Sequence, residues 1–311
     1  MAYAPLPDHP DDRVPGAVAA ATVLYRPDAG VLDELLTPLE ADGLRLFIFA
    51  NGPLDEEIER RLARSPHAAL IRAPENMGLG HGLNAVTEAA AAEGFAFVLL
   101  LDQDSVPTPG MASALLAHLG ALAASPTPPP AVIGPLLVSP AEEGYLAPWY
   151  SRRAAKDGVA EGAVDFLSTS GSLVSLAAWQ AVGPFRADYF IDGIDVEWCF
   201  RAWNRGHGCY LAEEVTMPHR WGGTAENGKR QPQILRQSQL RSYYYLRNGL
   251  YGLRLAHIPW SWRLRTAARV TAQAVLLLLA HRFDRPIRRL VFGALRDGLQ
   301  ARLGPAPPGI A

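Results

Sequence analysis

The chain has 311 residues, of which 49% are hydrophobic, and a formal net charge of -2. It can therefore bury a core large enough for one large α/β domain with an appendage, or for two small domains. The near-neutral charge gives no electrostatic reason to expect a nucleic-acid partner. Cys199 and Cys209 form no CxxC pair or metal-ligand spacing, so a reduced, cytoplasmic chain is expected rather than a disulfide scaffold.

Residues 1–15 are rich in proline and aspartate. They lack the basic start and apolar run of a signal peptide, so this segment is expected to be a flexible tail.

The following stretch alternates short apolar runs with helical patterns. Strands are predicted at Ala17–Leu24, Leu44–Ala50, Ala68–Arg72 and Phe95–Leu101, and helices between them at Val31–Ala41, Asp55–Arg64 and Leu79–Ala92. This alternation predicts an α/β fold with a mostly parallel, Rossmann-like sheet and helices on both faces. Such sheets bind ligands beyond the carboxyl ends of their strands. Polar side chains fall there: Thr22, Tyr25, Asn51, Asn76, Asp102 and Asp104.

The second half is expected to add shorter elements and then a helical region. We predict a strand at Val132–Val138, a strand or bent strand at Asp165–Leu176, a helix at Asp195–Arg205 and a short strand at Cys209–Leu211. From Gln233 the pattern is helical almost to the end. Two structured parts are therefore expected, a sheet domain at 16–232 and a helical region at 233–311.

The first acidic cluster follows the fourth strand directly, as Asp102-Gln103-Asp104-Ser105. Two carboxylates one residue apart at a strand end can reach one hard cation, and oxygen ligands suit Mg²⁺ or Mn²⁺ bridging to substrate phosphates. The alternative is an Asp-rich turn that caps the helix starting near Pro107.

The second acidic cluster is YFIDGIDVEWCFR, from Tyr189 to Arg201. We expect Asp195 to cap a helix, where the helix dipole favours an ionised carboxylate that can act as a general base. Asp192 is the competing candidate for this base. The alternative is a capping network without catalytic function.

His219 lies in the loop MPHRWGG and could complete a metal shell, because imidazole accepts Mn²⁺. Most histidines bind no metal. This one is singled out because a Gly-rich loop after the second acidic cluster could fold back over the metal.

Together these motifs resemble the family 2 glycosyltransferases of GT-A fold, and most closely their bacterial rhamnosyltransferase branch. The resemblance is carried by TVLYRPD (22–28), FANGP (49–53), ENMGLGHGLNAV (75–86), LLLDQDS (99–105), FLSTSGSLVS (166–175), YFIDGIDVEWCFRAWNRG (189–206), MPHRWGG (217–223) and RSYYYLRN (241–248). It implies a one-step, inverting transfer of a sugar from a nucleotide diphosphate donor to a glycan or lipid-linked glycan in cell-surface polysaccharide synthesis. dTDP-L-rhamnose is the favoured donor, and a UDP-hexose or UDP-galactofuranose is the alternative.

The resemblance also implies residue roles. Asp102 and Asp104 would bind the metal and diphosphate, His219 would be a late metal ligand and Asp195 the catalytic base. The nucleotide-sugar pocket would contain Thr22, Tyr25, Asn51, Asn76, Asn84, Asp102, Gly171, Ser172, Arg247 and Asn248. The chemistry of Arg247 and Asn248 suggests no specific role for either.

Residues 260–303 contain nine arginines and two aspartates among tryptophans and aliphatic residues. The longest apolar run, Ala274–Ala280, is too short to span a membrane. A basic amphipathic pair of helices suits the inner surface of the cytoplasmic membrane. Packing on the sheet domain, or contact between copies in a homo-oligomer, would explain the same pattern.

Three other functional classes predict different features. A sugar-nucleotide nucleotidyltransferase should have a Gly-rich basic loop after the first strand, where this chain has Tyr25-Arg26-Pro27-Asp28. A dinucleotide dehydrogenase needs GxGxxG at that place, but here a GxGxG run begins only at Gly78. A non-catalytic membrane-associated binding protein would leave both acidic clusters unexplained.

Overall fold

The computed structural model describes residues 17–123, 128–138, 150–153, 159–219 and 238–310. Among these residues a seven-stranded sheet has the order β3-β2-β1-β4-β6-β5-β7. Its strands are β1 (Val18–Leu24), β2 (Arg45–Asn51), β3 (Ala68–Ala73), β4 (Phe97–Asp102), β5 (Pro130–Val138), β6 (Ser172–Ser175) and β7 (Gly208–Pro218). The first four strands pair in parallel, as do β5 and β7, whereas β6 is antiparallel to both β4 and β5. The predicted α/β fold with a mostly parallel sheet is confirmed.

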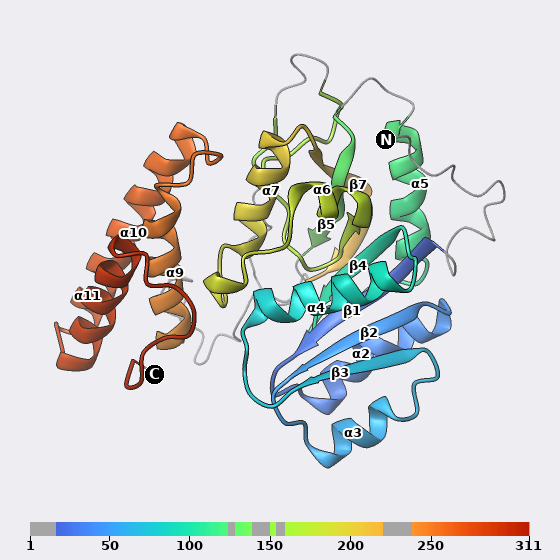
Figure 1. Ribbon diagram of the computed structural model, residues 1–311, viewed down its shortest axis with the longest axis horizontal. Coiled ribbons are helices and arrows are strands. Elements are labelled where there is room, and N and C mark those ends of the chain that lie inside the picture. Colours follow the sequence, from blue (N-terminus) through green and yellow to red (C-terminus); the bar gives the residue numbers. More distant parts are fainter. Residues whose placement is uncertain (1–16, 124–127, 139–149, 154–158, 220–237, 311) are drawn as a thin grey trace.

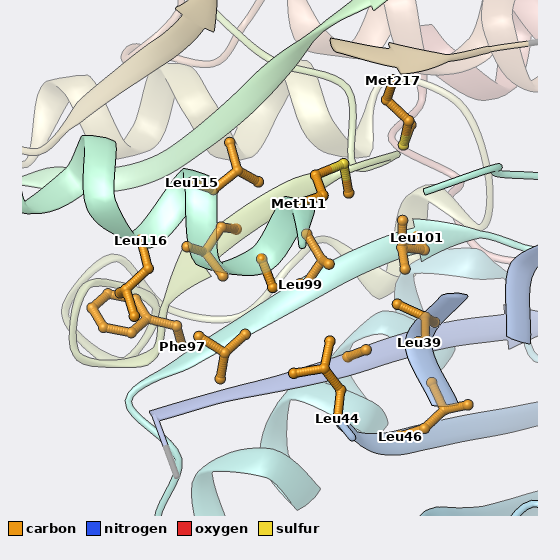
Figure 2. Packing of buried hydrophobic residues seen from close by; sticks show 14 of the residues in the cluster. Leu39, Leu44, Leu46, Phe97, Leu99, Leu101, Met111, Leu115, Leu116 and Met217 are labelled. Carbon is orange, nitrogen blue, oxygen red and sulfur yellow. The ribbon is translucent and has the colours of Figure 1, made fainter. Parts of the chain in front are cut away.

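Helices cover both faces of the sheet because its strands alternate apolar side chains between two cores. In β1, Val18 and Ala20 enter one core and Ala19 and Ala21 enter the other. The helices α2 (Ala29–Ala41), α3 (Glu56–Leu62) and α5 (Met111–Ala123) supply the first core, part of which Figure 2 shows. The helices α4 (Leu79–Ala92), α6 (Leu176–Val182) and α7 (Ile194–Asn204) supply the second.

The glycines before and within α4 allow this helix to approach its neighbours closely. A Cβ on Gly82 would lie 2.8 Å from Val23 of β1, and one on Gly80 would lie 2.6 Å from the carbonyl oxygen of Arg186. Real Cβ atoms do not tolerate such distances. The GLGHG run is therefore a packing motif that holds α4 against both the sheet and the loop around residue 186.

The C-terminal region consists of α9 (Gln239–Gly252), α10 (Trp260–Ala280) and α11 (Arg285–Leu299), which lie together beside α7 (Figure 1). They share a third apolar core, which also contains Phe190 from the loop before α7. The ring of Phe190 stacks on Tyr244 with centroids 5.0 Å apart. The predicted helical C-terminal region is confirmed between Gln239 and Leu299. The expected boundary near 232 and the tail at 1–15 lie outside the described residues.

Several predicted boundaries were wrong. The helix α7 begins at Ile194 rather than Asp195, because Gly193 takes the left-handed conformation (φ 77°) and serves as its N-cap. Of the predicted strand at 165–176 only Ser172–Ser175 forms, and the chain then turns into the unpredicted helix α6. The strand β7 extends well beyond the predicted Cys209–Leu211, because its pairing with β5 continues past an irregularity.

No helix in the described parts of the chain combines the length and apolarity that a membrane crossing requires.

Candidate functional site

A cavity of about 450 Å³ lies at the carboxyl ends of β1, β2 and β4, and we call it the strand-end cavity. The loop before α7 and the start of α9 complete its wall. Seven residues predicted from the sequence line it: Tyr25, Asn51, Asn76, Asp102, Asp104, Asp192 and Asp195. The fold thus brings both acidic clusters, about ninety residues apart in the chain, to one opening.

Two asparagines shape the cavity on the side of β2. Asn51 donates from Nδ2 to Asn76 Oδ1 at 2.9 Å, and its own Oδ1 accepts from the backbone N–H of Met77 at 2.7 Å. Asn76 Oδ1 also accepts from Gly78 N at 2.9 Å. These bonds hold the loop from β3 to α4 in place and use much of the hydrogen-bonding capacity of the two asparagines. The first role of Asn51 and Asn76 is therefore to shape the cavity wall.

The first acidic cluster extends from the end of β4. Asp102 is the last residue of that strand, and the side chain of Gln103 accepts from the backbone N–H of Tyr25 at 2.8 Å, which ties the acidic turn to the end of β1. Burial, together with the negative charges of Asp104 and Asp195, raises the pKa of Asp102 to about 7, against the opposing charge of Arg241. The two acidic clusters are therefore close enough to repel each other.

Asp195 lies in the first turn of α7, where its Oδ1 accepts from the backbone N–H of Val196 at 2.8 Å. Burial raises the pKa of Asp195 to about 6, against the opposing effect of that hydrogen bond. A carboxyl with a pKa near 6, exposed to a cavity, is suited to accept a proton at neutral pH.

Asp192 is the second carboxylate of this cluster and is held by a cation. Its Oδ1 accepts from Nε of Arg241 at 3.0 Å. Burial raises the pKa of Asp192, and the positive charge of Arg241 partly offsets that rise. The charge of Arg241 also acts on Asp102 and Asp195, so this arginine neutralises part of the field of both clusters.

The carboxylates at the end of β4 have the chemistry of a divalent-cation site. Asp102 and Asp104 offer oxygen ligands, and their mutual repulsion would be relieved by a cation. Mg²⁺ commonly binds through one or two carboxylates and substrate phosphates, so this pair fits such an ion. Among the described residues, however, no three His, Cys, Asp or Glu side chains are grouped as a metal site. The role of His219 as the third ligand therefore stays a prediction.

His219 is buried and is not among the residues that line the cavity. Its Nδ1 is 3.4 Å from Oγ of Ser170, which is 2.7 Å from Oγ of Ser105. Burial lowers the pKa of His219, and the negative charge of Asp104 partly offsets this. The charge of Asp104 thus acts on His219. The histidine is also linked, through the hydroxyl of Ser170, to the hydroxyl of Ser105, which follows Asp104 in the chain.

Four residues predicted for the nucleotide-sugar pocket are absent from the lining of this cavity: Thr22, Asn84, Gly171 and Ser172. Thr22 is fully buried, because strand alternation turns it away from its neighbour Val23, which does line the cavity. Asn84 bonds both backbone groups of Phe185, at 2.9 and 2.8 Å. Gly171 packs against Met217, and the neighbouring Ser168 and Thr169 occupy the wall instead.

Arg247 and Asn248 are also absent from this wall, and the structure shows what they contact. Arg247 is fully buried and donates from Nη2 to the carbonyl of Tyr189 at 2.9 Å. Asn248 Nδ2 lies 3.0, 2.8 and 2.9 Å from the carbonyls of Tyr189, Ile191 and Asp192, and its Oδ1 accepts from Arg247 Nε. The pair therefore clamps the backbone of the loop that leads into Asp195.

The loop needs this clamp because its backbone is unusual. Phe190 and Asp192 have φ values of 66° and 65°, in the left-handed region that is unfavourable for residues other than glycine. The carbonyl of Phe190 accepts from the backbone N–H of Leu79 at the start of α4, whereas those of Tyr189, Ile191 and Asp192 point towards α9. The clamp satisfies these groups and fixes the position of both acids.

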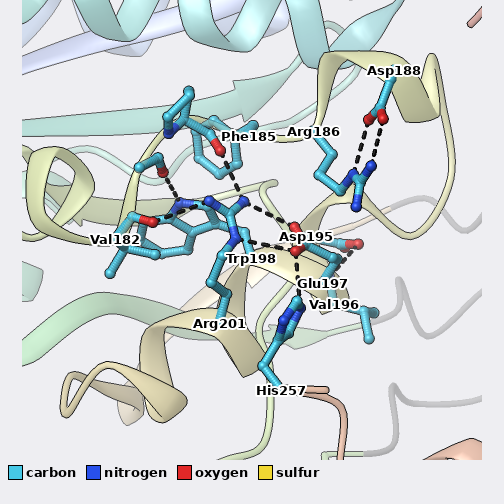
Figure 3. A network of polar contacts seen from close by, with 12 residues as sticks. Val182, Phe185, Arg186, Asp188, Asp195, Val196, Glu197, Trp198, Arg201 and His257 are labelled. Atoms are coloured by element: carbon cyan, nitrogen blue, oxygen red, sulfur yellow. Dashed lines mark hydrogen bonds and ion pairs between the residues drawn. The ribbon is translucent and has the colours of Figure 1, made fainter. Parts of the chain in front are cut away.

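Beside Asp195, Glu197 points to the opposite side of α7 and enters a buried polar network, which Figure 3 shows. Arg201 donates to it from Nε and Nη2 at 3.1 and 2.9 Å, and His257 Nε2 lies 2.9 Å from its Oε1. Arg201 also bonds the carbonyls of Val182 and Pro184. This network anchors the first turn of α7, and with it Asp195, against neighbouring loops.

Sequence reasoning missed one charged residue of the wall, Arg241, although it begins the RSYYYLRN segment. It also missed Gln103, whose side chain lies between the two aspartates in sequence but bonds the end of β1. Only the contacts in the folded chain assign these roles, although a basic residue at the start of an aromatic segment was a usable signal.

Comparisons with known proteins agree with this architecture. No protein-family model matches the chain. The dTDP-rhamnosyl transferase RfbF of Shigella flexneri is 23% identical over 296 residues, which span 92% of this chain and 97% of that protein. The structure of S. aureus TarS 1-349 in complex with UDP-GlcNAc superposes with a TM-score of 0.58 at 13% identity, covering 92% of this chain and 81% of that one.

A more distant structural match is GalNAc-T7 with UDP, GalNAc and Mn²⁺. It has a TM-score of 0.51 at 11% identity, over 82% of this chain and 54% of that one. These likenesses confirm the predicted GT-A fold. The curated relative bears out the resemblance to bacterial rhamnosyltransferases and supports the prediction of a glycosyltransferase.

Proposed function

We propose that this chain is an inverting, metal-dependent glycosyltransferase that moves a sugar from a nucleotide diphosphate donor to a glycan or lipid-linked glycan. One observation carries the proposal: the two carboxylates at the end of β4 and Asp195 line one cavity of a GT-A fold. This cavity combines an anionic site suited to a cation with a carboxylate suited to accept a proton.

The residues divide the chemistry as follows. Asp102 and Asp104 would hold Mn²⁺ or Mg²⁺, which when bound neutralises negative charge on a leaving diphosphate. Asp195 accepts the proton of an acceptor hydroxyl as that oxygen attacks the anomeric carbon. Asp192, paired with Arg241, holds its charge beside the reacting groups. Asn51 and Asn76 keep the loop beside the donor in place.

For the donor we favour dTDP-L-rhamnose, because the curated relative is named as a dTDP-rhamnosyl transferase. A UDP-hexose or UDP-galactofuranose is the alternative, and the structural matches with bound UDP or UDP-GlcNAc make it reasonable. The two groups of donors differ in base and sugar, so a binding panel separates them.

We further propose that the enzyme works at the inner surface of the cytoplasmic membrane, with residues 260–303 as the contact. Large apolar side chains are exposed on α10, α11 and the turn between them, among them Trp260 at 70%, Leu279 at 58%, Phe283 at 50% and Phe292 at 59%. The arginines nearby would attract anionic lipid headgroups. Flotation with liposomes at low and high salt tests this, and a homo-oligomer contact would instead give a concentration-dependent mass without flotation.

The experiment for the main proposal is a thermal-shift panel of sugar nucleotides with Mn²⁺, followed by transfer assays. A donor that binds only the native state raises the melting temperature. Asp195→Asn retains the side-chain shape but removes the base, so turnover should fall on the order of 10²–10⁴-fold while the donor still stabilises the fold. A near-normal rate would contradict the assignment.

The competing classes give different products in the same assay. A nucleotidyltransferase would join a sugar phosphate to a nucleoside triphosphate with release of pyrophosphate, and would consume pyrophosphate in the reverse direction. A non-catalytic protein would leave the donor intact. Only the proposed glycosyltransferase would transfer the sugar to an acceptor and release a nucleoside diphosphate.

A further inference from the structure

A second cavity, of about 250 Å³, lies between α7, α9 and α10, and we call it the helical cavity. Its wall includes Tyr245 and Gly252 of α9 and Trp262 and Arg269 of α10. It shares the residues Asp192 and Gly193 with the strand-end cavity. The two cavities are therefore neighbours, separated by a single turn of backbone two residues before Asp195.

The backbone at Asp192 and Gly193, which forms the partition between the two cavities, is held in place by hydrogen bonds. Asn248, itself on the wall of the helical cavity, holds the carbonyl of Asp192 at 2.9 Å. One carboxylate oxygen of Asp192 is paired with Arg241, and the other is buried with no hydrogen-bond partner among the described residues. That second oxygen is an unused hydrogen-bond acceptor at the partition, three residues before the proposed base.

The lining of the helical cavity has an aromatic and a polar part. Its floor is aromatic: the indole N–H of Trp262 is held by Asp165 at 2.8 Å, and its ring contacts Phe200 with centroids 5.2 Å apart. Its rim is polar, because Arg269 lies over Trp262 at 5.8 Å and its charge acts on the hydroxyl of Tyr245. A rigid apolar floor with a few polar groups at the edge is typical of small-molecule sites.

An apolar groove of about 300 Å³ lies next to this cavity, between α9, α10 and α11. The two share Leu253, and the groove is lined by aliphatic residues and Phe292, with Thr271 as its one polar residue. An open groove of this kind beside a polar cavity matches a molecule with a saccharide at one end and an apolar chain at the other.

We propose that the acceptor is such an amphiphilic saccharide, with its sugar in the helical cavity and its apolar chain in the groove. One hydroxyl would then reach past Asp192 and Gly193 to Asp195. This inference rests on the proposed glycosyl transfer and assigns the acceptor to a site separate from the donor site. A water-soluble glycan would make no use of the groove, so the structure favours a lipid-linked or otherwise alkylated acceptor.

A cavity-filling variant tests the site. A Cβ at Gly252 would have only the hydroxyl of Tyr189 nearby, at 3.7 Å, so Gly252→Leu can be accommodated while its side chain enters the cavity. Gly120→Leu is the matched control, since it is also a helical glycine but has nothing within 4 Å of its Cβ and lies on α5. The acceptors are methyl and octyl glycosides of glucose, galactose, N-acetylglucosamine and rhamnose.

We expect Gly252→Leu to raise the KM for an octyl glycoside about ten-fold or more, while the sugar nucleotide still raises its melting temperature. Gly120→Leu should match the parent protein in both measurements. An unchanged acceptor KM in a folded Gly252→Leu protein would overturn the inference and leave the proposed function intact. Failure of the parent protein to bind or use any sugar nucleotide would instead overturn the proposed function.

Two readouts do not depend on that variant. The octyl glycoside should have a lower KM than the methyl glycoside of the same sugar, and equal values would refute the role of the groove. An octyl glycoside carrying a diazirine on its chain should label peptides of α9, α10 or α11 after irradiation, even without turnover. Labelling confined to the strand-end cavity, or displaced by the donor alone, would refute the placement.

Discussion

Replacing Asn248 with alanine should weaken the fold and impair catalysis together, because this side chain holds the loop that carries the proposed acids. Its Nδ2 contacts the carbonyls of Tyr189, Ile191 and Asp192, and its Oδ1 accepts from the buried Arg247. Alanine would leave these groups without that partner in a region where water cannot easily replace it.

The magnitude follows from the bonds lost. Two N–H groups and one carbonyl oxygen of Asn248 are removed, and each neutral bond contributes about 0.5–1.5 kcal/mol, with more for the bond from the charged Arg247. The expected loss in the free energy of unfolding is about 2–5 kcal/mol. For a chain of this size that lowers the Tm by roughly 2 °C per kcal/mol, so most of the protein stays folded at 25 °C.

The catalytic effect should be larger than the loss of stability at 25 °C implies. Release of the loop shifts Asp192 and the start of α7, and a misplacement of about 1 Å at a reacting group can cost about 10²-fold in rate. Transfer rate at saturating donor and Tm by calorimetry should therefore both fall in Asn248→Ala. The exposed Asn204→Ala, at the end of α7, should change neither beyond error. An Asn248→Ala protein with the Tm and rate of Asn204→Ala would refute the clamp.

Three further predictions concern packing, donor binding and pH. Gly80→Ala should destabilise the fold by roughly 1–3 kcal/mol, because its Cβ would meet the carbonyl oxygen of Arg186 at 2.6 Å. Gly120→Ala, in open space, should be neutral or stabilising by up to about 1 kcal/mol; equal urea midpoints would contradict the packing argument. Asp104→Ala should abolish the Mn²⁺-dependent part of donor binding in calorimetry, and a heat that still requires Mn²⁺ would remove this residue from the metal site. Burial raises the pKa of Glu197, but its hydrogen bonds with His257 and Arg201 lower it on balance below the usual value. The ionised Glu197 carboxylate therefore stabilises the fold fully above the pKa of glutamate in the unfolded chain, about 4.3. This stabilisation is lost as the pH falls through the lower pKa of Glu197 in the folded protein. The stability advantage over Glu197→Gln should shrink below about pH 4, and a constant difference to pH 3 would contradict it.

Much of the fold and part of the site could be predicted from local pattern. The unbroken apolar run FVLLL leads into Asp102 and Asp104 exactly where a parallel strand ends, so their place at the cavity followed from periodicity. Thr22 was misplaced on the cavity wall because a fully buried strand shows no alternation that would reveal which face each side chain takes.

The helix start at Asp195 was misplaced by one residue for a similar reason. An aspartate before an apolar run is a common N-cap, and nothing local shows that Gly193 instead takes the left-handed conformation there. The prediction that Asp195 is the base does not depend on this boundary, because the helix dipole also favours an ionised carboxylate in the first turn.

The sequence by itself determined the alternation of strands and helices, the acidic pair at a strand end and the helical C-terminal region, because each depends on residues within a few positions of one another. Tertiary structure alone decided that the two acidic clusters share one cavity, that Arg241 pairs with Asp192, and that Arg247 and Asn248 support the loop instead of lining the donor pocket. These contacts join residues about fifty or more positions apart. Their partners are chosen by how α9 packs against the loop before α7, and no local periodicity encodes that packing.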